Sequence, residues 1–350
     1  MSDTSSRKKG HLDLFRGTQP AHGSKTTLME EVQLVPDPLP QLALSEVDPA
    51  IELFGRSLAF PLIISGMTGG TQVAAGLNRA LAQIAGEMGL GIGVGSQRAM
   101  LENRGRADTY TVRDAAGADT LVLGNLGIAQ VPGIAADDAQ WLVDAIDADA
   151  LVVHLNVAQE LVQSEGDRDF RGTAEALERL CSAVDKPVIV KEVGSGIPFE
   201  WGERFRDMGV AGIDVAGAGG TSWTYAEALR GDSRSQRIGM TFRDWGIPTA
   251  AAVAELAECG LPVVASGGIR TGLDIAKSIA LGASACGIAS PVIRTLMKDG
   301  ADAARRLLAM ILEEFRVAQM LTGSATVAEL GETRRVLGPT LRAWMESAGR

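Results

Sequence analysis

The feature that most constrains the fold is an alternation of short apolar runs with Ala/Leu-rich segments, which begins near residue 61. Eight runs rich in Val, Ile and Leu end in small or polar residues, as buried strands do. Strands that alternate with helices form parallel sheets, and eight is the number that closes a (β/α) barrel. The sequence therefore predicts the α/β class and a (β/α)8 TIM barrel. The predicted strands span residues 61–65, 90–94, 120–123, 150–154, 187–191, 210–215, 262–265 and 284–288.

The segments between these runs support the same fold. Their apolar residues recur at helical spacing, which predicts helices over residues 78–88, 135–146, 172–184, 249–258 and 273–280. The structural alternative is a doubly wound open sheet, which usually stops at five or six strands and needs a topological switch point.

The ends of the chain lie outside the alternation. Residues 1–60 are Pro-rich and acidic in part, and we expect an N-terminal arm that packs on the barrel and closes the active site. The barrel would span residues 61–298, and residues 299–350 would form a C-terminal helical extension of the same domain. An insertion at residues 217–246 is too long for an ordinary loop, which predicts a lid or an oligomer contact.

Composition narrows the function classes. The chain is 46% hydrophobic, only 4% aromatic and contains 42 glycines, as expected for a soluble α/β protein. A net charge of -10 disfavours nucleic acid as a partner but allows a local cationic pocket. Cys181, Cys259 and Cys286 lack the spacing of a zinc site or disulfide framework and are interpreted as buried thiols in a reducing cytoplasm. No apolar run is long enough to span a membrane, so a cytoplasmic protein is expected.

In a barrel of this kind the active site lies at the carboxyl ends of the strands. The loops after the last two strands would point backbone N–H groups at a phosphate, with Gly267, Gly268 and Arg270 in the first of them. The alternative is that these glycines only make tight turns. The predicted phosphate ligands are Gly267, Gly268, Arg270, Ala289 and Ser290.

Lys191 ends a buried strand and would place a cation in the barrel mouth, where it needs an anionic partner. A flavin is one such partner, because a cation near N1 and O2 stabilises the reduced ring. Four polar residues at other strand ends could bond the same ring, although each alone is a common turn or cap residue: Thr68, Ser96, Asn125 and Thr221. Neither a Rossmann G-x-G-x-x-G motif nor a P-loop is found.

A polar cluster, HLNVAQE at residues 154–160, follows the fourth strand and holds one of only three histidines. Glu160 could hold a hydrated Mg²⁺ that bridges to phosphate oxygens; the alternative is an exposed carboxylate at a helix start. A second anion site is possible if the basic arm covers the mouth, whereas the alternative is a solvated basic tail. That site would combine Arg7, Lys8, His11, Arg98 and Ser195.

Together these residues resemble the type 2, FMN-dependent isopentenyl-diphosphate isomerases over nearly the whole chain. The resemblance rests on RKKGHL at 7–12, MTGG at 67–70, GSQR at 95–98, GNLG at 124–127, HLNVAQE at 154–160, VKEVGSGI at 190–197, VAGAGGTSW at 215–223, SGGIR at 266–270 and ASP at 289–291. HLNVAQE and AGGTSW are specific, whereas GGIR and ASP also occur in other FMN barrels. Residues 22–48 depart from the family pattern.

The resemblance implies interconversion of isopentenyl and dimethylallyl diphosphate, with reduced FMN as acid/base, NADPH as the reductant and Mg²⁺ on Glu160. The flavin would be held by Thr68, Ser96, Asn125, Lys191, Thr221, Gly267, Gly268, Arg270, Ala289 and Ser290. The diphosphate would be bound by Arg7, Lys8, His11, Arg98, His154, Asn156 and Ser195. Gln159 and His154 would be the catalytic residues, with Gln159 near the reacting carbons and also counted as a substrate ligand. A homo-oligomer, a tetramer or an octamer, is expected by analogy.

Two other functions stay open at this point. One is an FMN-dependent oxidoreductase of the hydroxy-acid oxidase or inosinate dehydrogenase type, which shares the phosphate loops. The other is a non-catalytic flavin or prenyl-diphosphate binding protein.

Overall fold

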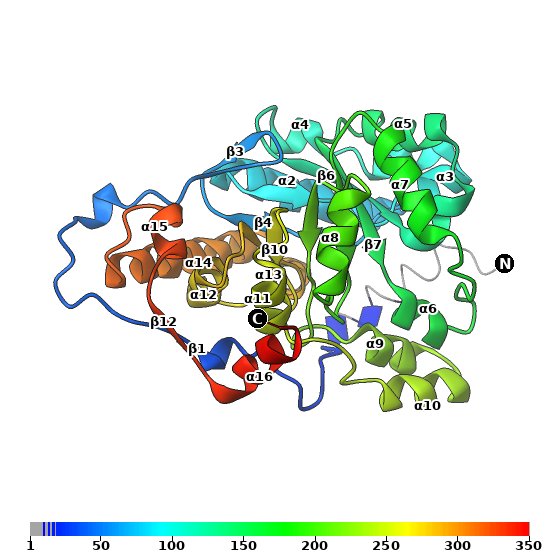
Figure 1. The fold of residues 1–350 in the computed structure, drawn as a ribbon. Helices are drawn as coiled ribbons and strands as arrows, with labels where there is room; N and C mark the ends of the chain where they lie inside the picture. The colour runs from blue at the N-terminus through cyan, green and yellow to red at the C-terminus, as the bar shows by residue number, and fades with distance from the viewer. Residues whose placement is uncertain (1–9, 11–12, 15, 18, 350) are drawn as a thin grey trace.

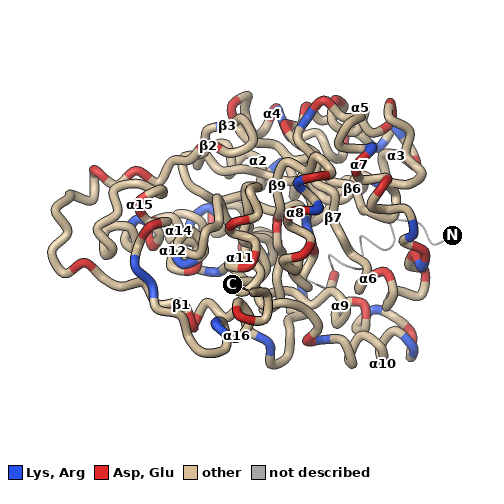
Figure 2. Tube along the Cα trace, viewed as in Figure 1, with Lys and Arg blue, Asp and Glu red and all other residues tan. Residues whose placement is uncertain are grey.

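The computed structural model describes residues 10, 13–14, 16–17 and 19–349. Arg7, Lys8 and His11 of the predicted second anion site lie outside the described residues. In Figure 1 a barrel of strands is surrounded by helices, and the blue N-terminal segment runs beside the orange and red C-terminal elements. Figure 2 shows acidic and basic residues interspersed along the whole chain, so the net negative charge is not gathered on one element.

Eight parallel strands close the barrel in the order β10-β11-β4-β5-β6-β7-β8-β9, which confirms the TIM barrel and excludes the open sheet. Closure is made by β11 against β4, where Cys286 pairs with Leu62. The strands are β4 (Leu62–Ile64), β5 (Gly91–Gly93), β6 (Val122–Gly127), β7 (Ala150–Leu155), β8 (Val188–Glu192), β9 (Gly212–Asp214), β10 (Val263–Ala265) and β11 (Ala285–Ile288).

The third barrel strand differs from the prediction, which ended it at Leu123. β6 continues to Gly127, and its last residues pair with β7, so that Asn125 lies opposite Val152. Two glycines suggested a loop here, yet the strand is fully buried. Gly124 is needed because a Cβ at this position would lie 2.8 Å from Gln97 Oε1.

Helices cover the outside of the barrel, as the apolar spacing predicted. They are α2 (Gln72–Met88), α3 (Arg98–Glu102), α4 (Arg113–Ala116), α5 (Ala136–Asp144), α6 (Val157–Val162), α7 (Thr173–Ala183), α8 (Glu200–Asp207), α11 (Thr249–Leu256), α12 (Gly272–Ala280), α13 (Ser290–Asp299) and α14 (Ala301–Leu321). No helix in the described part of the chain is long and apolar enough to cross a membrane.

The core has an outer and an inner layer because side chains alternate along each strand. In β4, Leu62 and Ile64 face the helices, whereas Ile63 faces the barrel interior. A hairpin of β2 (Ile51–Leu53) and β3 (Arg56–Leu58) adds Leu53 and Leu58 to the interior cluster and closes the amino-terminal end of the barrel. The interior is therefore packed, and a ligand can enter only from the other end.

The segment before the hairpin connects the barrel mouth with the C-terminal elements. Ser222 N–H donates to Pro20 O at 2.8 Å, and Ala250 N–H donates to Thr27 O at 2.9 Å. The arm contains two short helical turns, at Met29–Glu31 and Leu44–Glu46. Between them lies β1 (Val32–Leu34), which pairs antiparallel with β12 (Arg335–Leu337). The C-terminal elements also include α15 (Val327–Gly331) and α16 (Pro339–Ser347).

The insertion after β9 forms two helices, α9 (Trp223–Arg230) and α10 (Ser233–Thr241), which pack on each other and lie beside α6 (Figure 1). The connections elsewhere include 3-10 turns at Arg104–Thr109 and Ile128–Gly133. The three cysteines are free thiols, and burial was predicted for all of them. Cys259 and Cys286 are buried, but that prediction is wrong for Cys181, which stands half-exposed on α7.

Candidate active site

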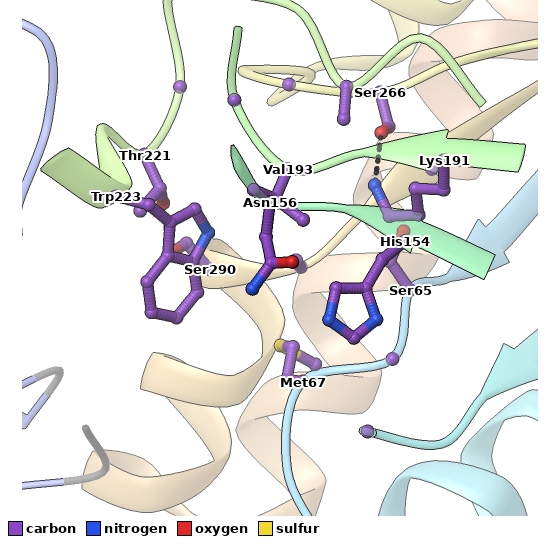
Figure 3. A pocket seen from close by; sticks show the side chains of 18 of the residues that line it. Ser65, Met67, His154, Asn156, Lys191, Val193, Thr221, Trp223, Ser266 and Ser290 are labelled. Carbon is purple, nitrogen blue, oxygen red and sulfur yellow. Dashed lines mark hydrogen bonds between the residues drawn. The ribbon is translucent and has the colours of Figure 1, made fainter. Parts of the chain in front are cut away.

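A cavity of about 230 Å³ lies at the carboxyl ends of the barrel strands, and the loops after all eight strands contribute to its wall. Figure 3 shows side chains from several of these strand ends, among them His154, Asn156 and Lys191, gathered around it. Most of the predicted site residues line this cavity: Thr68, Ser96, Arg98, Asn125, His154, Asn156, Gln159, Glu160, Lys191, Thr221, Gly267, Gly268, Arg270, Ala289 and Ser290.

Ser195 is not among the residues that line the cavity. Its N–H donates to Glu192 Oε2 at 2.5 Å, together with the N–H groups of Val193 and Gly194 at 2.6 Å each. Burial raises the pKa of Glu192 to about 7, against the lowering effect of these three donors. The Glu192 carboxylate thus shapes the loop after β8, and Ser195 is part of that loop.

The loop after β10 has the backbone geometry of an anion cradle. Gly267 and Gly268 have φ of +94° and +89°, and a Cβ on Gly267 would lie 2.1 Å from Gly217 O. A Cβ on Gly220 would lie 2.5 Å from Gly268 N. Only glycine fits where these two loops meet back to back, so the backbone N–H groups can approach a ligand closely.

Arg270 and two hydroxyls tie the cradle together. The Arg270 guanidinium donates to Gly268 O at 2.8 Å and to Gly219 O at 3.1 Å. The hydroxyls of Thr221 and Ser290 lie 3.2 Å apart, which joins the loop after β9 to the start of α13. The positive end of α13 adds to the attraction for an anion.

Lys191 has a partner within the chain. Its Nζ lies 3.3 Å from Asp214 Oδ2 and donates to Ser266 Oγ at 3.2 Å, the contact dashed in Figure 3. Ser266 in turn donates to Asp214 Oδ1 at 2.5 Å. Sequence reasoning expected an anionic ligand for Lys191 and missed Asp214. The signal was present, because an acidic residue interrupts the apolar run of the sixth barrel strand.

His154 is oriented by Asn125, whose Oδ1 lies 2.7 Å from His154 Nδ1. An oxygen there places the ring proton on Nδ1. Gln97, which is fully buried, holds the backbone of Asn125 in place. Gln97 Oε1 accepts from the backbone N–H of Asn125, and the backbone N–H of Gln97 donates to Asn125 O, both at 2.7 Å. Gln97 was not predicted as part of the site, since no local sequence pattern distinguishes a residue that contacts a site residue from one that does not.

Gln159 is held by a buried carboxylate on the insertion. Its Nε2 donates to Glu227 Oε1 at 2.8 Å, and Gln163 donates to the same oxygen at 2.8 Å. Arg230 pairs with the other oxygen at 2.7 Å. The α9 helix therefore fixes the orientation of the Gln159 amide, and Glu227 is a second residue that sequence reasoning missed.

Glu160 is only 4% exposed, so the alternative of an exposed carboxylate at a helix start is wrong. Its two oxygens accept from Asn156 Nδ2 at 2.8 Å and from Asp167 N–H at 2.9 Å. Within the described residues no cluster of three or more His, Cys, Asp or Glu side chains could hold a metal alone. A cation here would need oxygens from a ligand, as Mg²⁺ typically does.

Two buried polar atoms in the cavity wall, Thr68 Oγ1 and Asn156 Oδ1, find no hydrogen-bond partner in the described chain. Buried polar atoms are rarely left unpaired, so these atoms indicate a bound polar ligand. Together with the glycine cradle, they fit a flavin phosphate on one side of the cavity and a polar group near Asn156.

The arm adds residues that were not predicted. Gln19 lines the cavity, and the buried His22 donates from Nε2 to Gly194 O at 3.2 Å. Burial lowers the pKa of His22, which keeps the ring neutral near pH 7.

Comparison with known proteins decides the family. The model of the FMN-dependent dehydrogenase family matches residues 127–336. An isopentenyl-diphosphate delta-isomerase of Methanopyrus kandleri is 42% identical over 93% of this chain and 90% of its own. Enzymes of the same name from Methanosarcina mazei and Stutzerimonas stutzeri are 42% and 43% identical, covering 100% and 94% of this chain and 96% of theirs. The chain belongs to the isopentenyl-diphosphate delta-isomerase family.

A solved structure of lower identity has the same fold. A solved structure of mandelate oxidase with benzoyl-formic acid has a TM-score of 0.63 and 21% identity, and the match covers 94% of each chain. At that identity the likeness concerns the fold alone. The resemblance inferred from the motifs is confirmed, and the family model supports FMN as the cofactor.

Proposed function

We propose that this protein interconverts isopentenyl diphosphate and dimethylallyl diphosphate, with FMN, NADPH as its reductant, and Mg²⁺. The observation that supports this most is one cavity lined by a glycine cradle on one side and by the polar cluster at residues 154–160 on the other. When bound, reduced FMN would supply a proton donor and acceptor next to the substrate.

The flavin fits the half of the cavity built from β10, β11 and β4. Its phosphate would lie against Gly267, Gly268, Ala289 and Ser290. Arg270 would hold the loop in place through its hydrogen bond to Gly268 O. Its ring would meet Ser96, Asn125, Lys191, Thr221 and the unpartnered Thr68 hydroxyl at the other strand ends.

The substrate diphosphate would occupy the other half. Arg98 lines the cavity, and its guanidinium group forms ion pairs with Glu102 at 3.2 Å and Asp167 at 3.8 Å. A proton on His154 Nε2, in addition to the one on Nδ1, and the second N–H of the Asn156 amide would donate to phosphate oxygens, and Glu160 would hold Mg²⁺. Arg7, Lys8, His11 and Ser195 complete the proposed set of diphosphate ligands.

The reaction moves a double bond, so one carbon gains a proton and another loses one, with no net redox change. Gln159 cannot titrate, and its amide is fixed by Glu227, so its role is to orient the C5 chain or relay a hydrogen bond. Binding energy from the remote diphosphate positions a substrate that has few other polar groups.

The direct test is anaerobic incubation with FMN, NADPH, Mg²⁺ and isopentenyl diphosphate. We expect dimethylallyl diphosphate to form, and Gln159→Leu to lower kcat by about 100-fold or more while FMN stays bound. Gln83→Leu is the matched control, because Gln83 also donates to a glutamate, Glu87, but does so on the surface of α2. Absence of product with demonstrably reduced flavin would rule out the proposed activity.

We also propose a homo-oligomer, a tetramer or an octamer. The α10 helix and the turn after it expose Met240, Phe242 and Trp245 at 49%, 44% and 59%, a grouping that indicates a protein contact. Light scattering coupled to size-exclusion chromatography tests this, and a monomer at micromolar concentration would contradict it.

A further inference from the structure

Lys191, which lines the cavity, pairs with Asp214, a residue to which the proposed function gives no role. Lys191 and Asp214 are the last residues to pair between β8 and β9, which puts both at the same level of the barrel. Their side chains are 14% and 10% exposed. Lys191 Nζ is therefore balanced by a carboxylate of the chain before any ligand binds.

The carboxylate is held from several sides. Asp214 Oδ1 accepts from Ser266 Oγ at 2.5 Å and from Ala216 N–H at 3.2 Å, while Oδ2 lies 3.3 Å from Lys191 Nζ. Ser266 also accepts from Lys191 Nζ at 3.2 Å, so the three side chains form a closed triangle. Such a triangle fixes both the position of the ammonium group and the opposing charge behind it.

This arrangement has a consequence for a flavin above Lys191. An unopposed ammonium group would strongly favour the reduced ring, which carries extra negative charge. A carboxylate about 3 Å behind the ammonium group weakens that preference, since charges of opposite sign at similar distances largely cancel.

We propose that Asp214 is a positioning residue that acts through Lys191 to hold down the reduction potential of bound FMN. This inference rests on the FMN binding in the proposed function. It assigns a role to a residue that touches neither the glycine cradle nor the cluster at 154–160.

The test is anaerobic potentiometric titration of the FMN-loaded protein with reference dyes. In Asp214→Asn we expect the ratio of affinities for reduced over oxidised FMN to rise about tenfold, which is about 30 mV in the positive direction for a two-electron couple. Asp149→Asn is the matched control: Asp149 is another half-buried carboxylate paired with arginines, but at the opposite end of the barrel. Its potential should equal that of the wild type.

A second pair of variants separates action through Lys191 from a direct field. In a Lys191→Met background, Asp214→Asn should shift the ratio by less than half as much as it does alone. An equal shift in both backgrounds, or no shift in Asp214→Asn with FMN bound, would overturn the proposal.

If Asp214→Asn does not retain FMN, Ser266→Ala is measured instead. It removes the hydroxyl that holds the Asp214 carboxylate beside the Lys191 ammonium group, so the carboxylate can move away and oppose that charge less. A change of about twofold to threefold in the same direction is expected, and an unchanged potential would overturn the proposal. Wild-type protein that takes up no FMN would instead contradict the proposed function.

Discussion

The two ends of the barrel treat their polar groups in opposite ways. At the amino-terminal end Asp149 is paired completely: Arg56 and Arg113 lie at 2.7 and 2.9 Å, and Val122 N–H donates at 2.8 Å. At the carboxyl end the Thr68 hydroxyl and the Asn156 carbonyl are buried without a partner in the described chain. One end is thus complete as folded, and the other is complete only with a ligand.

The difference can be expressed as free energy. A buried polar group without a partner costs about 1–3 kcal/mol, so the carboxyl end gives up stability that ligand binding would restore. Substitutions at the amino end should therefore change stability and leave binding alone, whereas substitutions at the carboxyl end should do the reverse.

The largest effect on binding is expected at Gly267. Its φ of +94° and the 2.1 Å distance from a built Cβ to Gly217 O exclude a side chain, so Gly267→Val should displace the cradle. Loss of two charge-assisted N–H contacts predicts about 100-fold weaker FMN binding, measured by flavin fluorescence. Gly76→Ala is the control, because a Cβ there meets nothing within 4 Å. Equal FMN affinity in both variants would contradict the cradle.

Arg113 tests the other end. It donates to Asp149, Asp147 O and Thr120 O, so Arg113→Ala leaves a carboxylate and two carbonyls short of a donor. We expect the free energy of unfolding to fall by about 2–3 kcal/mol in urea titrations, less than for a fully broken pair because Arg56 remains. FMN affinity per folded molecule should be unchanged, and a parallel loss of affinity would break the comparison.

Glu255 lies on α11, one of the helices outside the barrel, and so belongs to neither end. Burial raises the pKa of Glu255 to about 7, and the negative charge of the neighbouring Glu200 adds to this shift. A backbone hydrogen bond from Phe199 acts in the opposite direction and lowers the pKa. Since the folded pKa lies above the ordinary value of 4.5, ionised Glu255 destabilises the fold at high pH and has no such effect below about pH 4.5. Glu255→Gln should raise the unfolding free energy by about 2 kcal/mol at pH 8 and leave it unchanged at pH 4.5. A gain that is equal at both values would show that ionisation is not the cause.

The smallest effect concerns the arm at the mouth. The Asp244 carboxylate accepts from Gly23 N–H at 2.5 Å and from Ser24 N–H and Oγ at 3.0 and 2.9 Å. Although burial opposes ionisation, these donors lower the pKa of Asp244 to about 2. Asp244→Ala should speed tryptic cleavage after Lys25 by about threefold to tenfold, followed by mass spectrometry. Asp207→Ala, at an exposed helix end, serves as control, and equal rates would show that the arm is held elsewhere.

The features that were predicted correctly from the sequence are those that depend on a few neighbouring residues. Eight strands and the glycine loops followed from runs of a few residues each, because burial and tight turns leave a local signature. The partners Gln97, Asp214 and Glu227 did not follow, since each acts across strands or from an inserted helix. Their positions depend on barrel register, which no single segment contains.

The same limit explains one error in the extent of a strand and one environment that the sequence left open. Asn125 was placed after a strand because glycines surround it, yet pairing with β7 keeps it inside β6. Glu160 had two candidate environments, and only the return of Asp167 over the start of α6 decides between them. In both cases a residue far along the chain supplies the deciding contact.

The pairing of β1 with β12 also bears on how this protein is made. Val32 meets Leu337, so β1 lacks its strand partner until residue 337 has left the ribosome. The eight barrel strands are all synthesised before that point, and domains generally fold as units during synthesis. The β1 strand is therefore among the last elements to be fixed, whereas Pro20 and Thr27 at the mouth can bond to Ser222 and Ala250 as soon as the barrel has formed.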